Sequence, residues 1–185
     1  MKDIIKIKKY YKDFISLLNN IQKFIPKKIK LKNILLNSKK KNKKIFIFGN
    51  GGSAAIASHF IIDVKKNTNL NIQNLPDISS LTCFANDYGF DNYIKEIISK
   101  SGSSGDLLIL VSSSGKSKNM INALKEARKK NFSKIVTLTG FNKKNYLNLN
   151  GDLNFWVNSK VYNYVENIHQ IILLSVIDLI HLRIK

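Results

Sequence analysis

Two short, continuous apolar runs in this chain each end in a turn made largely of small residues. The first run, residues 45–48, leads into the turn 49–53, and the second run, residues 107–111, leads into the turn 112–117. An unbroken apolar run of this length is typical of a strand that is buried on both faces, as in parallel sheets. We therefore expect a parallel sheet, with both turns at its carboxyl edge.

Further apolar patterns extend this prediction along the chain. Helical spacing predicts helices at residues 3–25, 29–37, 54–66, 90–100, 117–130 and 162–184. Apolar runs predict strands at residues 134–138 and 153–157, and one more near 80–84. Pro26 is expected to end the first helix, and the lysine-rich segment 38–44 to form a loop. The alternation from residue 45 onward favours an α/β fold, a doubly wound parallel sheet of about five strands flanked by helices.

A single domain is expected over residues 1–185. That length suits one domain with its own core, and the sequence contains no internal repeat or interdomain linker. Residues 45–185 are expected to form the α/β core. Residues 1–44 are expected to form an N-terminal helical extension that packs against the sheet or in an oligomer interface.

The formal net charge of +19 raises the question of nucleic-acid binding. Residues 1–44 hold 15 of the 31 lysine and arginine residues and carry +13 of the net charge. The only arginines are Arg128 and Arg183, whereas readout of base edges favours arginine. We therefore interpret the charge as a solvated lysine-rich face and expect no specific binding to nucleic acid.

Membrane attachment and disulfide bonds are not expected either. Lysines interrupt the apolar pattern near the N-terminus, so no signal peptide is predicted. The apolar segment 171–180 contains Ser175 and Asp178 and is too short to span a bilayer. Cys83 is the single cysteine, which excludes a disulfide within the chain and fits a reducing compartment. We expect a cytoplasmic protein.

The two turns have the chemistry of a phosphate-binding site. In open α/β sheets, ligands bind at the carboxyl ends of the strands. Small residues expose backbone N–H groups and hydroxyls there, and the helix after each turn adds partial positive charge at its N-terminus. Neither turn is a P-loop or a complete dinucleotide-binding fingerprint, so each one alone is also compatible with a plain tight turn. Two such turns at equivalent positions favour a cradle for phosphate.

Two predicted helices carry candidate acid–base groups. His59 and Asp63 are spaced to share a face of their helix, although such a pair forms a local hydrogen bond more often than a metal or catalytic site. Glu166 and His169 lie among apolar residues of the last helix. Because burial raises the pKa of a carboxyl, Glu166 is a candidate general base. The alternative is an exposed Glu166 that only favours the helix dipole.

Five sequence elements, taken in order, resemble those of the phosphoheptose isomerase branch of the SIS (sugar isomerase) family. They are Gly49-Asn50-Gly51-Gly52-Ser53-Ala54-Ala55 with His59-Phe60, Asn86-Asp87-Tyr88-Gly89, Ser112-Ser113-Ser114-Gly115 with Ser117, Thr139-Gly140, and Val165-Glu166 with Ile168-His169. The resemblance extends from about residue 3 to residue 183. The ordered set is far more specific than any one element, and it implies the SIS fold.

The resemblance implies an enzyme that isomerises a sugar phosphate, namely sedoheptulose 7-phosphate to D-glycero-D-manno-heptose 7-phosphate, for lipopolysaccharide or capsule heptoses. The reaction passes through a cis-enediol, which needs a base beside the carbonyl and a group that steadies the enediolate. A homotetramer is also implied. By match with the motifs, the phosphate would be held by Ser53, Ser112, Ser113, Ser114 and Ser117. The sugar site would be lined by Asn50, Gly51, Gly52, Asn86, Asp87 and Glu166.

Three positions depart from the pattern of the best-studied members. These have Glu at the position of Asp63, Gln at that of Glu166 and a second His at that of Leu174. Because members can hold zinc with this set, His59, Asp63 and Glu166 are candidate zinc ligands, and Asp63 with Glu166 is the expected acid–base pair. Leu174 keeps two alternatives open: a variant enzyme on a related sugar phosphate, or a non-catalytic binding or scaffold protein. The latter would be like the relative that associates with the bacterial replication initiator.

Overall fold

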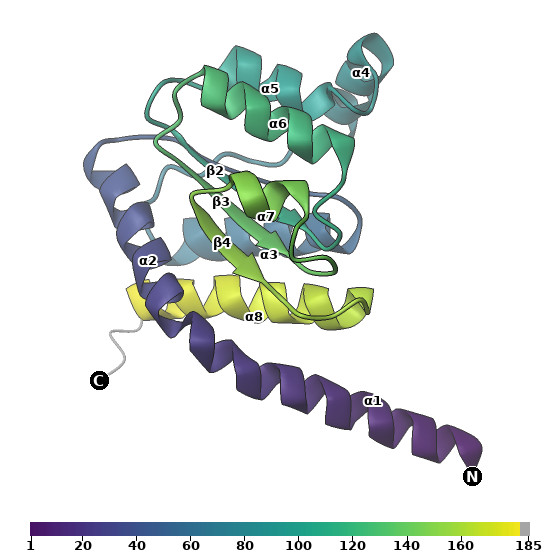
Figure 1. Cartoon of the computed structure of the whole chain (residues 1–185). Helices are drawn as coiled ribbons and strands as arrows, with labels where there is room; N and C mark the ends of the chain where they lie inside the picture. The colour runs from purple at the N-terminus through teal and green to yellow at the C-terminus, as the bar shows by residue number, and fades with distance from the viewer. Residues whose placement is uncertain (182–185) are drawn as a thin grey trace.

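The structure is a computed structural model, and it describes residues 1–181. Its elements, shown in Figure 1, are α1 Lys2–Asn19, the 3-10 helix η1 Asn20–Phe24, α2 Ile25–Lys40, β1 Ile45–Gly49, α3 Gly52–Asn67, α4 Ile78–Tyr88, α5 Tyr93–Ser101, β2 Leu107–Ser112, α6 Lys118–Lys129, β3 Lys134–Thr139, α7 Tyr146–Asn150, β4 Leu153–Trp156 and α8 Tyr162–His181. Strands and helices alternate from Ile45 onward, so the predicted α/β class is confirmed.

The sheet of the described residues has four parallel strands in the order β1-β2-β3-β4. They coincide with all of the predicted strands except the one predicted near residues 80–84. Both faces of β1 and β2 are buried, which explains why these segments are continuously apolar. In register, Ile45 pairs with Leu107, and Leu107 pairs with Lys134. The sheet has one strand fewer than predicted.

A short extended segment lies at the outer edge of β1, where a fifth strand would stand. Ile72 forms an isolated parallel bridge with Ile45. Next to it, Ile45 N donates to the Asn71 carbonyl at 2.8 Å, and Gln73 N donates to the Ile45 carbonyl at 2.9 Å. The connection that follows β1 therefore leads to one edge of this strand, whereas β2 pairs with its other edge. Connections that diverge in this way open a crevice at the carboxyl ends of the two strands, where ligands bind in such sheets.

Helices cover both faces of the sheet, as the doubly wound fold requires. Side chains alternate between the two faces along each strand. Ile45 and Ile47 pack in a core cluster with α2, α3 and α8, whereas Phe46 and Phe48 pack in a second cluster with α5, α6 and α7. Figure 1 shows α5 and α6 on one side of the strands, and α3 and α8 on the other.

The segment near residue 80 is a helix, and the strand prediction there is wrong. Residues 80–84 lie within α4. Asp77 caps this helix, because its side chain accepts a hydrogen bond from Ser80 N at 2.7 Å. Leu81 and Phe84 are three residues apart and pack against the second core cluster from one side of the helix. The apolar residues of this segment therefore follow the period of a helix and not the alternation of a strand.

The N-terminal extension is helical, but its boundaries differ from the prediction. Pro26 stands in the first turn of α2, where its missing N–H costs no hydrogen bond, so it starts a helix instead of ending one. The 3-10 helix Asn20–Phe24 connects α1 to α2. Because α2 continues to Lys40, part of the predicted loop 38–44 is helical.

Helix α1 projects from the body of the molecule (Figure 1) and has no buried residue. It contacts α8 where the Tyr164 hydroxyl donates to the Tyr10 carbonyl at 2.8 Å, and where the rings of Phe14 and Tyr164 lie 5.6 Å apart. Its exposed large apolar side chains are Ile4, Ile5, Ile7, Tyr11 and Ile15. Helix α1 therefore presents apolar surface that the described part of the chain leaves uncovered.

The last helix, α8, packs against α3 and α2. Of the predicted helix 162–184, the part up to His181 is helical, and residues 182–184 lie outside the described residues. Within residues 1–181, every helix is too short or too polar to cross a membrane.

Candidate functional site

The first turn joins β1 to α3 in very little space. Gly51 has a φ of +53°, in the region that favours glycine. A Cβ at Gly49 would overlap the Ser53 carbonyl, so the first turn of α3 lies directly against the end of the strand. Ser53 is only 3% exposed. The positive end of α3 therefore stands at the carboxyl edge of β1, where an anion is favoured.

The second turn joins β2 to α6 and is held by its own hydrogen bonds. Gly115, with a φ of +64°, donates its N–H to the carbonyl of Ser112 at 3.0 Å and to the Ser112 hydroxyl at 3.2 Å. The Ser114 hydroxyl accepts from Lys116 N at 3.3 Å. Ser117 is the N-cap residue of α6, but its side chain makes no capping hydrogen bond. Its hydroxyl is therefore free to bind a ligand.

The two turns meet at one small cavity of about 110 Å³. Its lining residues are Asn50, Ser53, Val111, Ser112, Ser113, Ser114, Ser117 and Tyr162. The volume is below that of pockets for whole drug-sized ligands and suits a phosphate group. The Ser113 hydroxyl is buried and has no hydrogen-bond partner within the described residues. Since buried polar groups are nearly always paired, this hydroxyl is expected to bind a ligand atom or an ordered water.

An amide pair fixes the two turns relative to each other. Asn50 Nδ2 donates to Asn119 Oδ1 at 3.0 Å, and Asn119 Nδ2 donates to Asn50 Oδ1 at 2.9 Å. Asn119 is 1% exposed in the first turn of α6. Asn119 was not among the predicted site residues, although a signal was present in the sequence. Asn119 precedes Met120 and is four residues from Ala123 on the apolar face of α6, where a polar side chain needs a buried partner.

A larger cavity of about 310 Å³ lies beside the first one. Its lining residues are Gly52, Ala55, Ile56, His59, Asn163, Glu166, Asn167 and Gln170. Residues adjacent in sequence line the two cavities, because Ser53 and Tyr162 line the first, and Gly52 and Asn163 the second. A phosphorylated ligand held in the first cavity can therefore extend its carbon chain into the second.

Glu166 is the acidic side chain of this larger cavity. Its carboxylate packs so closely against Gly52 that a Cβ at this glycine would overlap both the carboxylate carbon and its oxygens. Burial raises the pKa of Glu166, and the neighbouring Ser113 hydroxyl opposes this by favouring the charged form, although it makes no hydrogen bond of ordinary geometry. Glu166 is therefore not merely an exposed carboxylate at the start of a helix, which was the alternative interpretation. A carboxyl with a raised pKa exchanges protons more readily near neutral pH.

His59 lines the same cavity and lies between two polar groups. Gln170 Nε2 lies 3.2 Å from His59 Nδ1, so the amide donates to this nitrogen and leaves the ring hydrogen on Nε2. On the other side, His59 Nε2 is 3.6 Å from Asp63 Oδ2. Asp63 itself lines neither cavity. His59 and Asp63 are therefore close neighbours, as their spacing suggested, but they do not form the local hydrogen bond, and His59 lines the cavity together with Glu166.

The three candidate zinc ligands do not form a metal site within this chain. Among residues 1–181, no three side chains of His, Cys, Asp or Glu are grouped closely enough to hold a metal ion. His59 and Asp63 are neighbours, but Glu166 does not complete a cluster with them. Leu174 lines an adjoining cavity of about 400 Å³ and offers no ligand atom.

Asn86 and Asp87, predicted to line the sugar site, lie elsewhere in this chain. Both are exposed on α4, and neither lines the two cavities. Asn86 Nδ2 donates to Asp87 Oδ1 at 3.0 Å, and the Cys83 thiol lies 3.8 Å from Asp87 Oδ2. Of the other predicted contact residues of the sugar, Asn50, Gly52 and Glu166 line the cavities, whereas Gly51 does not.

His169 has a structural position beneath the site. It is fully buried, and its Nε2 donates to the Thr139 carbonyl at the end of β3 over 3.2 Å. Burial lowers the pKa of His169 to about 4, so the ring is neutral near pH 7. The contact ties α8, which carries Glu166, to the carboxyl edge of the sheet.

Four lining residues on α8 were not predicted. They contribute to the cavities because α8 runs past the ends of β1 and β2, and they are Tyr162, Asn163, Asn167 and Gln170. Asn163 and Gln170 are three and four residues from Glu166, so they share its face of the helix. That spacing was the only signal in the sequence, and it does not show which residues α8 meets.

Comparisons with known proteins agree with this geometry. A model of the SIS domain family matches residues 9–140 of the chain. The phosphoheptose isomerase of Fusobacterium nucleatum is 36% identical over 151 residues, which cover 78% of this chain and 76% of that protein. The phosphoheptose isomerase of Campylobacter concisus is 42% identical over 107 residues, so the match spans 56% of that protein and 55% of this chain.

A solved structure extends the likeness to nearly the whole fold. The phosphoheptose isomerase from Neisseria gonorrhoeae superposes with a TM-score of 0.87 at 27% sequence identity, covering 95% of this chain and 96% of that one. The paired turns, the parallel sheet and the helical extension of this chain are thus parts of one shared architecture. The chain belongs to the phosphoheptose isomerase family of SIS-domain proteins.

Proposed function

We propose that this chain is an enzyme that isomerises sedoheptulose 7-phosphate to D-glycero-D-manno-heptose 7-phosphate in the cytoplasm, for the heptoses of lipopolysaccharide or capsule. The observation that carries the proposal is the position of Glu166. Its carboxylate lies against Gly52, where a serine-lined cavity that suits phosphate adjoins a larger polar cavity. The names of the relatives support the substrate class.

The phosphate group would bind in the smaller cavity. Its oxygens would accept hydrogen bonds from the unpaired Ser113 hydroxyl, from Ser117 and from backbone N–H groups of the two turns. The N-termini of α3 and α6 both add positive potential there. Anchoring the phosphate fixes the position of the sugar carbons, which converts proton transfer into a reaction between held groups. The carbons nearest the carbonyl would extend past Gly52 toward His59.

Glu166 would move the proton between the two carbons, and His59 would steady the enediolate. Glu166 would take a proton from C1 of the ketose and return it to C2, with an enediolate between the two steps. The proton of the C1 hydroxyl would pass to the C2 oxygen within the enediolate, while His59, whose ring hydrogen is on Nε2, donates a hydrogen bond to that oxygen without losing its own proton. Asp63, 3.6 Å from His59 Nε2, would act as a positioning residue for the imidazole. Of the acid–base pair expected from the sequence, Glu166 thus keeps its role as the base, and Asp63 acts through His59.

No step of this proposal passes through zinc. The candidate ligands His59, Asp63 and Glu166 do not converge within the described residues, and Leu174 adds no ligand atom. Activity is therefore expected to survive incubation with a chelator. A loss of activity that zinc restores would contradict this part of the proposal.

Self-association into a homotetramer is part of the same proposal. Apolar side chains on a projecting helix are unfavourable in water and are typical of a contact with another protein surface. The uncovered residues of α1, among them Ile7 and Tyr11, provide such a surface. The SIS relatives align across the helical extension as well, since the family match begins at residue 9.

A second candidate function follows from one residue. Leu174 places an apolar side chain where the best-studied members have an imidazole, and this favours a protein that binds a sugar phosphate without converting it. Such a protein could act as a scaffold, like the SIS relative that associates with the bacterial replication initiator. It needs the smaller cavity but not Glu166.

Incubation with sedoheptulose 7-phosphate, followed by NMR of the sugar carbons, separates the two candidates. The isomerase predicts conversion to the aldose, together with a thermal shift on adding the sugar phosphate. The binding protein predicts the thermal shift without conversion. If neither conversion nor a thermal shift occurs, both candidates are wrong. A Ser117→Ala variant is the matched control, because loss of one phosphate contact should raise KM about tenfold and leave kcat largely unchanged.

A further inference from the structure

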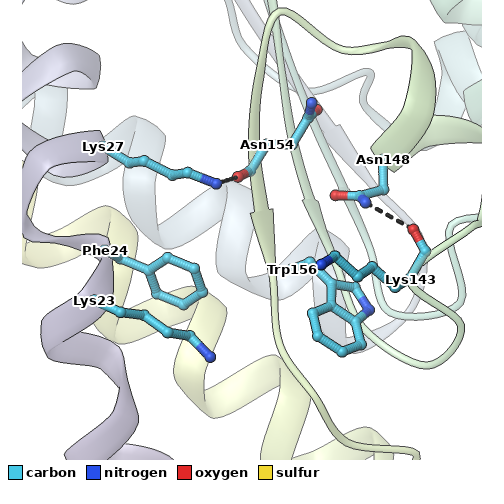
Figure 2. A pocket seen from close by; sticks show the side chains of 7 residues that line it. All are labelled: Lys23, Phe24, Lys27, Lys143, Asn148, Asn154 and Trp156. Atoms are coloured by element: carbon cyan, nitrogen blue, oxygen red, sulfur yellow. Dashed lines mark hydrogen bonds between the residues drawn. The ribbon is translucent and has the colours of Figure 1, made fainter.

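A second polar cavity, of about 470 Å³, lies at the opposite edge of the sheet from β1 (Figure 2). It is lined by Lys23, Phe24, Lys27, Lys143, Asn148, Asn154 and Trp156. These residues come from η1 and the first turn of α2, from edge strand β4, from the segment between β3 and α7, and from α7 itself. None of them lines the two cavities of the proposed isomerase site.

Aromatic rings, not carboxylates, neighbour the three ammonium groups. The Nζ atoms of Lys23 and Lys27 lie 5.2 Å and 5.9 Å from the centre of the Phe24 ring. Lys143 Nζ lies 5.7 Å from the Trp156 ring centre, and Figure 2 shows its side chain crossing the indole. Within residues 1–181, no carboxylate lies within 4 Å of these ammonium groups. The positive charge of the cavity is therefore not neutralised by ion pairs.

The three charges act on each other. Desolvation lowers the pKa of Lys27, and the charges of Lys143 and Lys23 lower it further. Lys27 Nζ donates to the Asn154 carbonyl at 2.7 Å, which holds the ammonium at the edge of β4. Repulsion between like charges is relieved when an anion binds among them. The site thus favours a ligand with more than one negative charge.

The indole of Trp156 adds a flat surface and an unused donor. Its N–H is enclosed and has no hydrogen-bond partner within the described residues. A buried donor of this kind is normally paired, so a ligand oxygen would satisfy it once the Lys143 side chain turns toward an anion. The face of a tryptophan also stacks well on a flat ring.

We propose that this cavity is a separate binding site for a small polyphosphate compound with a flat ring, the chemical class of nucleoside diphosphates and triphosphates. Lys23, Lys27 and Lys143 bind the phosphate groups, and Trp156 stacks on the ring. The volume suits a small molecule. A nucleic acid is a less favoured occupant, because none of the lining residues is an arginine, the side chain that reads base edges best.

Trp156 makes the test direct, because it is the only tryptophan of the chain. Its fluorescence therefore reports on this cavity and not on the isomerase site. We expect inorganic tripolyphosphate, added to the full chain at fixed ionic strength, to change the fluorescence with a saturable curve. ATP should bind more tightly than tripolyphosphate, since its ring adds a stacking contact.

Variants separate this site from general attraction to a basic protein. Lys27→Ala and Lys143→Ala should each weaken tripolyphosphate binding about tenfold, as expected for one charge-assisted hydrogen bond. Lys39→Ala removes an exposed lysine of α2 that lies outside the cavity, and it should leave the affinity unchanged. Ser117→Ala should also leave it unchanged, because Ser117 belongs to the other site. Circular dichroism checks that each variant is folded, and Lys27→Arg should retain binding if charge is what matters.

Four results would overturn the proposal. The first is no saturable change of fluorescence with millimolar tripolyphosphate, and the second is an equal loss of affinity in Lys39→Ala. The third is equal affinity for ATP and tripolyphosphate, which removes the flat ring from the assignment. The fourth is much tighter binding to single-stranded oligonucleotides, with affinity that grows with length, which would assign the surface to nucleic acid.

Discussion

At the scale of single residues, the site depends on the contact between Gly52 and Glu166. The absence of a side chain at Gly52 lets the carboxylate lie against the backbone at the start of α3, in partly buried surroundings that raise its pKa. A group of this kind, next to a phosphate cradle, has both the position and the proton affinity for acid–base work.

Gly52→Ala is expected to displace Glu166 and to lower kcat/KM about 100-fold, because a shift of about 1 Å in a catalytic group has an effect of this size. The measurement is the rate of isomerisation. Ala55→Gly is the matched control, since it changes a small residue of the same cavity and helix without adding atoms near the carboxylate. Equal rates for Gly52→Ala and the unchanged chain would contradict the role of this contact.

Glu166→Gln is expected to change activity and stability in opposite directions. Removing the base should lower the rate at least about 100-fold. The folded state binds the Glu166 proton more tightly than the unfolded chain does, so its contribution to stability is lost as pH rises through the raised pKa. Thermal melts should therefore show the variant as the more stable protein at pH 8, and the difference should shrink toward pH 4. A variant that is less stable at pH 8 would mean that Glu166 is not held in a desolvated position.

At the scale of elements, the hydrogen bond from His169 to the Thr139 carbonyl holds α8 at the end of β3. Because the pKa of His169 falls from 6.5 to about 4 on folding, the unfolded chain binds this proton more readily. Stability from this group is complete above pH 6.5 and decreases as the pH falls toward 4, by up to about 3 kcal/mol.

NMR titration of the His169 imidazole measures this directly, and the ring should remain neutral down to about pH 4. Denaturant unfolding of the unchanged chain should show the matching loss of stability in acid, and His169→Gln should reduce that loss. An imidazole that titrates near pH 6.5 would contradict its burial beneath the site.

Elements were predictable from the sequence where burial on both faces leaves a clear pattern. Residues 45–48 and 107–111 are uniformly apolar because helices cover both sides of their strands. The segment 80–84 was wrongly predicted as a strand because its apolar residues are few. In addition, Asp77 was not recognised as the residue whose capping hydrogen bond starts α4.

The candidate site was predictable only in part. The serines of the two turns follow their strands directly, so their meeting at one edge follows from the parallel sheet. Asn119 stands as a polar residue on the apolar face of α6, so the sequence indicated a buried partner but not that this partner is Asn50. Tyr162 enters the site through the packing of α8, which local sequence does not encode. Asn86 and Asp87 were assigned to the sugar by resemblance alone, and α4 keeps them away from the two cavities of this chain.

At the scale of the whole molecule, a single chain does not explain why α1 exposes apolar side chains to solvent. Its exposed isoleucine and tyrosine side chains face solvent along a projecting helix (Figure 1). Assembly with further copies of the chain would bury them and contribute the hydrophobic stabilisation that one copy lacks.

The double variant Ile7→Gln with Tyr11→Gln is expected to shift the proposed homotetramer toward smaller species, because it removes apolar area from the proposed interface. Sedimentation velocity measures the distribution of species. Lys8→Gln is the control on the same helix, and it should leave the distribution unchanged. A monomeric unchanged chain, or a double variant with unaltered assembly, would contradict an interface at α1.

The central claim is that two turns hold a sugar phosphate while Glu166 moves a proton between neighbouring carbons. The most direct measurement is isomerisation of sedoheptulose 7-phosphate in D₂O, with deuterium located by NMR. We predict that the unchanged chain forms the aldose with deuterium at C2, to the extent that the proton held by Glu166 exchanges with solvent before its return, and that Glu166→Gln forms no deuterated aldose. Conversion or incorporation by Glu166→Gln at the rate of the unchanged chain would contradict the claim.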